Sequence, residues 1–389
     1  MRILIAGMSY APSFNGQSVF TTTLAEGLAR RGHEVWVLFP SNIGKPYSSE
    51  RNGVHIQTVR AIELRFLHDE LYGSFFPDQE VRRFFKGCKP DIAHIQDHYP
   101  LSVCVLHAAR RLKIKVIGTN HFMPDNLAPY VPLLPSLKPT FNSILWMWMK
   151  STFNSLDVAT VPSATAAEIV RSQGVSVPVY PISCGVNLAR FHPDPAVDRK
   201  GLRLRYGLDA EKKTFIYVGR VDGEKRVDVL IRAIKILARD DIQLVVTGIG
   251  AALPKLRELV HGLELKDSVR FTDFVPASDL PGLLNSVEFF AMPSEVELLS
   301  IASLEAMASG LPILAARARA LPELVTDGLN GYLFNPGDAA DIARCMEMLI
   351  DHPENWSLMS NASLKKVSPH NIENVLDRYE ALYMQLVMT

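Results

Sequence analysis

The stretch that decides the fold is residues 2–39, RILIAGMSYAPSFNGQSVFTTTLAEGLARRGHEVWVLF. The short apolar run Arg2–Ala6 predicts a buried strand, and a turn-rich loop follows it as far as Gly16. Thr21–Arg31 has the spacing of an amphipathic helix that ends at Gly32, and His33–Phe39 is the next apolar strand. Strand, loop, helix and strand in this order form the unit from which parallel sheets are built.

The same alternation of strand and helix recurs along the rest of the chain. It predicts an α/β protein with two doubly wound, Rossmann-like domains, residues 1–185 and 186–371, joined at the turn-rich segment Cys184–Pro195. The long helix Ile372–Val387 is expected to return, so that residues 372–389 pack on the first domain. Ligands of such sheets bind beyond the carboxyl ends of the strands, so the loops at these ends are the places to look for a site.

Composition describes an ordinary globular protein, with 389 residues of which 48% are hydrophobic and 21% charged. The four cysteines are far apart and indicate thiols in a reducing, cytoplasmic compartment. No apolar run is long enough to span a bilayer, so any membrane contact is expected to be peripheral. Residues 1–185 hold 18 Lys and Arg against 13 Asp and Glu, a net +5 that favours an anionic partner other than nucleic acid.

Two glutamates mark the strongest candidate site. Glu297 lies in a loop, and Glu305 lies in the predicted helix Ile301–Ser309, which is rich in Ala, Met and Leu. A helix N-terminus carries free N–H groups that suit phosphate, and carboxylates accept hydrogen bonds from sugar hydroxyls. The alternative is ordinary complementation of the helix dipole. Together the two features favour a sugar-nucleotide ligand.

Two cations follow the predicted strand Thr214–Val218, in the segment Gly219–Arg226. Arg220 and Lys225 would lie at the carboxyl end of this strand, where they suit a diphosphate leaving group. The alternative is a solvated basic turn. Because these cations would stabilise the departing charge, and no Asp-x-Asp metal signature follows a suitable strand, no cofactor or essential metal is expected.

Weaker signals lie in other strand-end loops. Gly16 would let the backbone approach a phosphate, or it belongs to an ordinary turn. His121 follows the strand Lys115–Thr119 and would bond a sugar hydroxyl or act as a base, although a lone histidine is more often structural. Phe274 and Val275 would contact a nucleobase, or they belong to the core.

A proline-rich stretch, residues 131–139, leads into a Trp- and Met-rich helix that contains Trp146 and Trp148 between Lys138 and Lys150. Tryptophan and lysine favour membrane interfaces, and a lipid-facing helix predicts exposed aromatic side chains. The alternative is packing within the core of the first domain.

Several of these motifs together resemble glycosyltransferase family 4, whose members are retaining enzymes with the GT-B fold. The resemblance covers essentially the whole chain. It rests on the Gly16 loop and on four further segments: Ile182–Pro193, Gly219–Lys225, Glu297–Gly310 and Leu321–Leu333.

The resemblance implies roles for individual residues. Arg220 and Lys225 would grip the donor diphosphate, and Gly16 would approach it from the first domain. Glu297 would contact the transferred sugar and Glu305 the ribose. The remaining implied donor contacts are Gly219, the histidine His121 near the reacting centre, and the backbone of Leu298, Leu299, Ser300 and Ile301.

Two positions depart from the pattern that many members share. Leu298-Leu299-Ser300 replaces Gly-Phe-Gly after the first glutamate, and Lys225-Arg226 replaces Lys-Gly, so the shape of the donor pocket stays open. The segments Leu298–Glu305 and Asn120–Pro124 look most like members that glycosylate membrane lipids such as diacylglycerol.

The expected activity is therefore transfer of a hexose from a nucleotide diphosphate sugar, with UDP-glucose as the expected donor, to a lipid hydroxyl at the inner face of the cell membrane. The first domain would bind the acceptor and the second the donor. A GDP-mannose-dependent mannosyltransferase acting on a phosphoinositide or a polysaccharide is the alternative. A non-catalytic sugar-nucleotide-binding subunit and a sugar-nucleotide epimerase are more distant ones.

Overall fold

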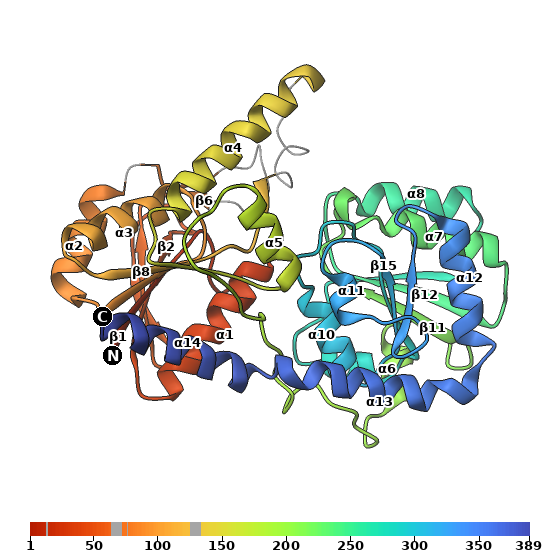
Figure 1. Ribbon diagram of the computed structural model, residues 1–389. Coiled ribbons are helices and arrows are strands. Elements are labelled where there is room, and N and C mark those ends of the chain that lie inside the picture. Colours follow the sequence, from red (N-terminus) through yellow and green to blue (C-terminus); the bar gives the residue numbers. More distant parts are fainter. Residues whose placement is uncertain (13–14, 64–71, 76, 125–133) are drawn as a thin grey trace. The chain divides into compact units, whose positions relative to one another are not determined.

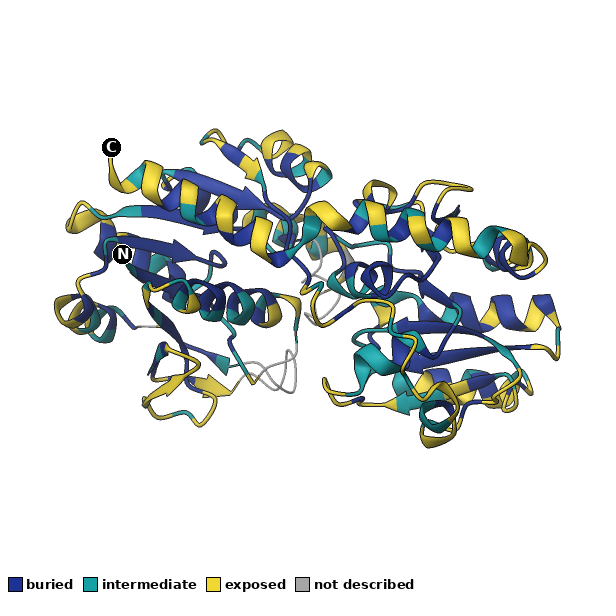
Figure 2. Ribbon diagram, turned by 90° about the horizontal axis from the view of Figure 1, so that it is seen from below, coloured by how far each residue is buried: buried dark blue, intermediate teal, exposed yellow. Residues whose placement is uncertain are grey.

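The chain divides into two compact units, described by a computed structural model for residues 1–12, 15–63, 72–75, 77–124 and 134–389 (Figure 1). Unit 1 consists of Met1–Ser183 with Val375–Thr389, and unit 2 consists of Cys184–Asn374. This division lies two residues before the boundary drawn from the sequence between residues 185 and 186. Each unit is a doubly wound α/β structure, which confirms the predicted fold class. Most strands of the two large sheets are buried, and the helices around them expose their outer faces (Figure 2).

Unit 1 is built on an eight-stranded sheet of order β10-β9-β8-β7-β1-β2-β4-β3, in which only the β3–β4 pairing is antiparallel. Its strands are β1 (Arg2–Ala6), β2 (Glu34–Pro40), β3 (Ser48–Arg51), β4 (Val54–Val59), β7 (Ile92–Ile95), β8 (Lys115–Thr119), β9 (Val158–Val161) and β10 (Val179–Pro181). A separate pair joins β5 (Ile62–Glu63) to β6 (Tyr72–Gly73). The α-helices are α1 (Gly16–Arg30), α2 (Asp78–Cys88), α3 (Pro100–Arg111), α4 (Lys138–Phe153) and α5 (Ala164–Ser172), and η3 (Pro135–Leu137) is a 3-10 turn.

Helix α1 begins at Gly16, five residues before the predicted start at Thr21. The Asn15 side chain accepts a hydrogen bond from the Ser18 N–H at 2.9 Å and so caps the helix. Burial of Ser18, Thr21 and other residues on the inner face then outweighs the low helix propensity of this Gly-, Ser- and Thr-rich turn. The prediction was therefore wrong at this boundary. No element was predicted for residues 41–91, where the structure has β3, β4 and α2.

The last helix, α14 (Ile372–Val387), starts in unit 2 and belongs to unit 1 from Val375 onward. It packs so closely on α1 that a Cβ atom on Gly27 would lie 2.7 Å from the Leu376 side chain. The Tyr383 hydroxyl lies 2.7 Å from His94 Nδ1, and His94 Nε2 lies 2.6 Å from Thr119 Oγ1. A buried chain of neutral hydrogen bonds thus ties α14 to the sheet.

Unit 2 is built on a six-stranded parallel sheet of order β13-β12-β11-β14-β15-β16. Its strands are β11 (Lys213–Val218), β12 (Ile242–Thr247), β13 (Val269–Asp273), β14 (Phe289–Met292), β15 (Ile313–Ala316) and β16 (Gly331–Phe334). Its helices are α6 (Arg199–Arg205), α7 (Val227–Leu237), α8 (Leu253–Gly262), α9 (Leu280–Asn285), α10 (Ile301–Ala308), α11 (Leu321–Leu324), α12 (Ala339–Ile350) and α13 (Trp356–Val367). Short 3-10 turns are η4 (Gly223–Lys225), η5 (Pro353–Asn355) and η6 (Ser368–His370).

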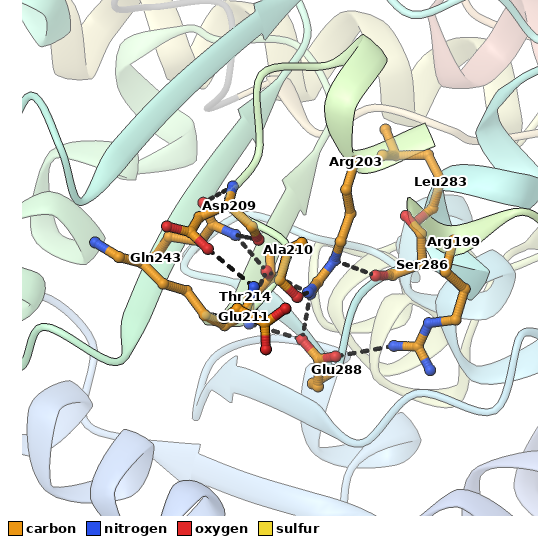
Figure 3. A network of polar contacts seen from close by, with 11 residues as sticks. Arg199, Arg203, Asp209, Ala210, Glu211, Thr214, Gln243, Leu283, Ser286 and Glu288 are labelled. Carbon is orange, nitrogen blue, oxygen red and sulfur yellow. Dashed lines mark hydrogen bonds and ion pairs between the residues drawn. The ribbon is translucent and has the colours of Figure 1, made fainter. Parts of the chain in front are cut away.

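A buried guanidinium fixes the amino ends of β11 and β14 (Figure 3). Arg203 donates to the Ser286 carbonyl at 2.8 Å, to Thr214 Oγ1 at 2.8 Å and to Glu288 at 2.8 Å, and Arg199 reaches the other oxygen of Glu288. Because Thr214 opens β11 and Glu288 precedes β14, this network holds the two strands together at one end. Their opposite ends carry the candidate site.

Helix α4 extends away from the sheet of unit 1 (Figure 1). Its C-terminal part is anchored by the buried Met149 and Phe153, whereas Ile144 and Met147 are 51% and 62% exposed. Across the residues described, no helix combines the length and the apolar character needed to cross a bilayer.

Candidate active site

The unit 2 sheet has its topological switch point between β11 and β14. The chain proceeds from β11 outward through β12 to β13 on one side, and from β14 through β15 to β16 on the other. In open parallel sheets, a ligand crevice forms where the two directions diverge, beyond the carboxyl ends of the strands. The two loops at this point carry the strongest sequence-predicted residues, Arg220 and Lys225 after β11 and Glu297 after β14.

The loop after β11 is held by close backbone packing. Gly219 and Gly248 both have positive φ angles, of 152° and 134°, and a Cβ atom on Gly248 would lie 1.9 Å from the Gly219 carbonyl oxygen. A side chain at Gly248 is therefore sterically excluded. The buried Tyr217 hydroxyl donates to the Arg220 carbonyl oxygen at 2.6 Å and fixes the other side of the loop.

Arg220 is the more exposed of the two predicted phosphate-binding cations. Its guanidinium is hydrogen-bonded to the buried carboxylate of Asp222 and donates to Glu224 at 3.0 Å. The side chain is 37% exposed, so solvent reaches it. Arg226 pairs separately with Glu295 at 2.7 Å.

Lys225 and Glu297 form an ion pair across the switch point. Lys225 Nζ lies 2.6 Å from Glu297 Oε1, and both side chains are largely buried. Burial raises the pKa of Glu297, but the attraction of Lys225 and its hydrogen bond outweigh burial and leave this pKa below its usual value. Glu297 is therefore a charged acceptor, already oriented by a cation.

Glu305 lies one turn inside α10 and differs from Glu297 in its surroundings. Its carboxylate has no hydrogen-bond partner in the part of the chain that the structure describes. Burial raises the pKa of Glu305 to about 7, an effect that Arg190 only partly offsets. A half-buried carboxyl without a partner is suited to accept hydrogen bonds from the hydroxyl groups of a ligand.

The segment between the two glutamates ends in an unusual cap. Ser300, the N-cap of α10, has φ 75° and ψ 93°, and its hydroxyl accepts from the Ser303 N–H at 3.2 Å. Leu298 and Leu299 are buried, and Ile301 is the first helical residue. Within the described chain, no acceptor bonds the backbone N–H groups of Leu298–Ile301, so these groups stay available to an anion.

Phe274 and Val275 follow β13, two strands away from β11 in the same sheet. Phe274 is half exposed and Val275 is buried. They share the carboxyl edge of the sheet with the ion pair.

Comparison with known proteins identifies the two halves. Residues 14–190 match the family described as glycosyltransferase family 4, and residues 198–366 match the family described as glycosyl transferases group 1. The chain is a GT-B glycosyltransferase of family 4. This confirms the family, the fold and the enzyme class predicted from the sequence.

Full-length relatives of this glycosyltransferase differ in their substrates. The chain is 26% identical to the alpha-monoglucosyldiacylglycerol synthase of Streptococcus pneumoniae, over 100% of this chain and 87% of that protein. It is also 26% identical to the GDP-mannose-dependent alpha-mannosyltransferase of Corynebacterium glutamicum, over 100% and 88%. Among solved structures, Anabaena HepE in complex with UDP-glucose matches with a TM-score of 0.79 and 16% identity, over 98% of this chain and 99% of that one; this likeness concerns the fold alone.

The family 4 half of the glycosyltransferase holds the other two predicted residues, Gly16 and His121. Gly16 is the first residue of α1, and a Cβ atom there would meet nothing within 4 Å among the described atoms. His121 follows β8, and its Nε2 lies 2.8 Å from Gln96 Oε1. Gly16 and His121 thus lie in unit 1, whereas Arg220, Lys225, Glu297, Glu305 and the backbone of Leu298–Ile301 lie in unit 2.

One residue of unit 1 has a larger role than its sequence signal indicated. The Asp97 carboxylate accepts four hydrogen bonds, from the backbone of Met8 and Tyr99 and from the side chains of Gln17 and Ser102, at 2.6 to 3.0 Å. It therefore orders the loop after β1. The signal for Asp97 that the sequence offered was its position two residues after the strand β7.

The tryptophans of α4 are not exposed in the way that a lipid-facing helix predicts. Trp146 and Trp148 are both half-buried, and the Trp148 ring contacts the rings of His98 and Tyr99 at centroid distances of 5.4 and 6.1 Å. The exposed apolar side chains of α4 are aliphatic instead. Of the proline-rich stretch before α4, residues 131–133 lie outside the described chain.

Among the residues described, no group of three or more His, Cys, Asp or Glu side chains could hold a metal ion.

Proposed function

We propose that this glycosyltransferase is a retaining hexosyltransferase that moves glucose from UDP-glucose to a hydroxyl of a membrane lipid such as diacylglycerol. The observation that carries the proposal is the Lys225–Glu297 ion pair at the switch point of unit 2. It joins a cation suited to a diphosphate to an anion suited to sugar hydroxyls within 2.6 Å, which matches the two chemical parts of a nucleotide sugar.

The charges of the loop after β11 suit the diphosphate. Arg220 and Lys225 approach from one loop, and the N–H groups of Leu298–Ile301 add donors at the start of α10. Arg220 and Lys225 are both held by carboxylates, so a bound diphosphate would share these cations with Asp222, Glu224 and Glu297. These cations supply the charge stabilisation that a metal ion provides in other transferases.

Transfer with retention would proceed on one face of the sugar. The bond between the anomeric carbon and the β-phosphate oxygen breaks, the acceptor oxygen forms a new bond on the same face, and the departing phosphate oxygen takes the acceptor proton. Arg220 and Lys225 stabilise the charge that develops on the phosphate. Glu297 holds the sugar, and Glu305 holds the ribose.

The lipid acceptor is supported by α4 and by one relative. Ile144 and Met147 expose apolar surface, Lys138 and Lys150 flank them, and no acidic residue occurs between residues 126 and 156. A basic, apolar helix of this kind suits an anionic membrane interface. The likeness to a glucosyldiacylglycerol synthase along the whole chain points to the same class of acceptor.

A GDP-mannose-dependent mannosyltransferase is the second candidate, because a relative with that name is equally similar. The replacement of Gly-Phe-Gly by Leu298-Leu299-Ser300 alters the pocket where donors are distinguished, so the two donors call for a direct comparison.

A donor-by-acceptor array read by mass spectrometry tests the proposal. UDP-glucose with diacylglycerol in mixed micelles is expected to give a product heavier by one hexose, with α configuration, and with unchanged yield in EDTA. Turnover with GDP-mannose alone would favour the second candidate. Hydrolysis or epimerisation without an acceptor, or saturable binding without any transfer, would contradict both.

Membrane contact is tested separately by liposome flotation. The protein is expected to float with vesicles containing phosphatidylglycerol at low salt, and a variant with Ile144→Glu and Met147→Glu is expected to stay behind. Leu358→Glu, at an exposed apolar position of unit 2, is the matched control. Equal flotation of all three proteins would remove α4 from the proposal.

A further inference from the structure

A buried amide stands behind the predicted sugar-contacting histidine. Gln96, at the end of β7, is fully buried, and its Oε1 lies 2.8 Å from His121 Nε2. Its other polar atom, Nε2, has no hydrogen-bond partner among the residues that the structure describes. Since β7 and β8 are neighbours in the sheet, the two side chains meet at its carboxyl edge.

The contact between these side chains decides the proton position on the imidazole. An amide oxygen only accepts hydrogen bonds, so His121 must carry its proton on Nε2, and Nδ1 is left with a lone pair. Burial lowers the pKa of His121 to about 3, which keeps the ring neutral at physiological pH. The adjacent groups do not reverse this: the pKa of His94 is also lowered to about 3 by burial and by His121, and Asp97 is bound by four other donors.

The chemistry of the two free atoms defines the ligand. Gln96 Nε2 donates, and His121 Nδ1 accepts. A hydroxyl group both accepts and donates, whereas a phosphate or carboxylate oxygen would meet the Nδ1 lone pair unfavourably. A buried N–H group without a partner is also costly, which a bound hydroxyl oxygen would relieve.

We propose that Gln96 is a positioning residue that fixes the Nε2-protonated tautomer of His121, so that Nδ1 accepts from one hydroxyl of a bound sugar or polyol while Gln96 Nε2 donates to that molecule. The role in catalysis rests on the proposed hexosyl transfer, but the tautomer does not. Phe20 packs its ring on His121 at a centroid distance of 4.7 Å and so helps to hold the imidazole.

The tautomer is measured on the free protein by nitrogen-15 NMR of its histidine side chains. His121→Ala assigns the signals by their loss. We expect His121 Nδ1 to resonate as an unprotonated nitrogen and Nε2 as a protonated one. In Gln96→Met, which keeps the length of the side chain and removes the amide, both nitrogens are expected to shift toward an average of the two tautomers. A protonated Nδ1 in the wild type, or an unchanged spectrum in Gln96→Met, would overturn the proposal.

Kinetics then connect the tautomer to transfer. Gln96→Met is expected to lower kcat by roughly tenfold or more with little change in the donor KM, because a misplaced proton affects groups near the reacting atoms. In the double variant with His121→Ala, the loss should not exceed that of His121→Ala alone, since Gln96 acts through His121. Gln57→Met, on β4 between β2 and the edge strand β3, is the matched control and should match the wild type.

Additive losses in the double variant would mean that Gln96 acts by packing alone and would sink the proposal. If no donor supported transfer in any protein, the proposed hexosyltransferase activity would fail, while the spectra would still decide the tautomer. Thermal unfolding of each variant separates both results from a folding defect.

Discussion

The carboxyl edges of the two sheets carry different kinds of side chain. In unit 2 the groups at the switch point are charged and paired: Arg220 with Asp222 and Glu224, and Lys225 with Glu297. In unit 1 the corresponding edge carries the neutral pair Gln96 and His121. The same topology therefore supports two types of recognition.

This difference suits substrate groups of different charge. A nucleotide diphosphate sugar carries charge on its phosphates, and mobile or exchangeable ion pairs suit a charged group that must bind and leave. A sugar hydroxyl carries no charge, and a neutral pair of hydrogen-bond donor and acceptor binds it without the penalty of burying an ion. If the division is real, charge removal should harm the unit 2 edge, and loss of neutral hydrogen bonds should harm unit 1.

The largest effect is expected from Lys225→Ala. It removes the cation from the crevice and leaves the largely buried Glu297 without its partner. Loss of one preorganised electrostatic group of this kind lowers kcat by about 10² to 10³-fold, or roughly 3 to 4 kcal/mol. Nucleotide release with saturating donor and acceptor measures the effect.

Arg226→Ala is the matched control for Lys225→Ala. Arg226 is adjacent in the chain and pairs with Glu295 at the half-exposed rim of the site. Its loss should change kcat by less than about threefold, in keeping with the small contribution of exposed ion pairs. Near-normal turnover of Lys225→Ala would show that the charges of unit 2 are structural. The claim that these charged groups bind a charged part of the substrate would then be wrong.

The neutral side of the comparison is tested by Tyr383→Phe. The Tyr383 hydroxyl is the partner of His94 Nδ1 at 2.7 Å in the buried network of unit 1. Its loss leaves a buried polar atom unsatisfied and should lower the free energy of unfolding by about 1 to 3 kcal/mol. Urea unfolding measures it. Tyr180→Phe, at an exposed position of unit 1, should be neutral, and equal midpoints for the two variants would mean that the network adds nothing.

The parts of this fold that the sequence predicted are those with local signals. Strand-end loops after apolar runs placed Arg220, Lys225 and Glu297 on neighbouring strands, because parallel strands present their carboxyl ends at one edge. The start of α1 was missed because its first turn has poor helix formers, and only the Asn15 cap and burial stabilise it.

The contacts that were not predicted are those between distant segments. Nothing in the sequence near His121 indicates that Gln96, 25 residues earlier, accepts a hydrogen bond from its imidazole. The Asp97 carboxylate likewise accepts hydrogen bonds from Met8 and Gln17, which lie 89 and 80 residues earlier in the chain. Such partners become visible only when the order of strands in the sheet is known.

Glu305 is the exception on the charged side, and its pH dependence sharpens the comparison. Burial raises the pKa of Glu305 to about 7, so its ionised fraction falls about five- to sixfold between pH 7 and pH 6 and nearly tenfold for each further pH unit below 6. If the carboxylate accepts ribose hydroxyls, the donor KM should be lowest above pH 7 and rise by up to about tenfold per unit below it. Glu305→Gln should have a high donor KM at every pH.

The same pKa predicts that the stability of the fold decreases as pH rises, whereas donor binding improves. An acid whose pKa is raised in the folded state stabilises the protein below its unfolded pKa and loses that contribution as pH rises through 7. Unfolding midpoints of the wild type should therefore fall relative to Glu305→Gln between about pH 4.5 and pH 7. Glu295→Gln serves as the control. Parallel curves for the wild type and Glu305→Gln would show that the carboxyl titrates like an exposed one.

The smallest effect concerns the backbone between the two glutamates of unit 2. Ser300 holds φ at 75°, a conformation that glycine adopts without strain and that stresses other residues by about 1 kcal/mol or more. Its hydroxyl also caps α10, and exchanging a serine cap for glycine costs only a few tenths of a kcal/mol. Ser300→Gly is therefore expected to raise the free energy of unfolding by up to about 1 kcal/mol.

Ser300→Ala separates the two terms, because alanine keeps the strain and removes the cap. It should lower the free energy of unfolding by about 1 kcal/mol in the same urea titration. If Ser300→Gly were as destabilising as Ser300→Ala, the hydroxyl rather than the backbone would govern this loop. The neutral hydrogen bond from the Ser303 N–H to the Ser300 hydroxyl would then be needed to hold the backbone beside the charged groups of unit 2.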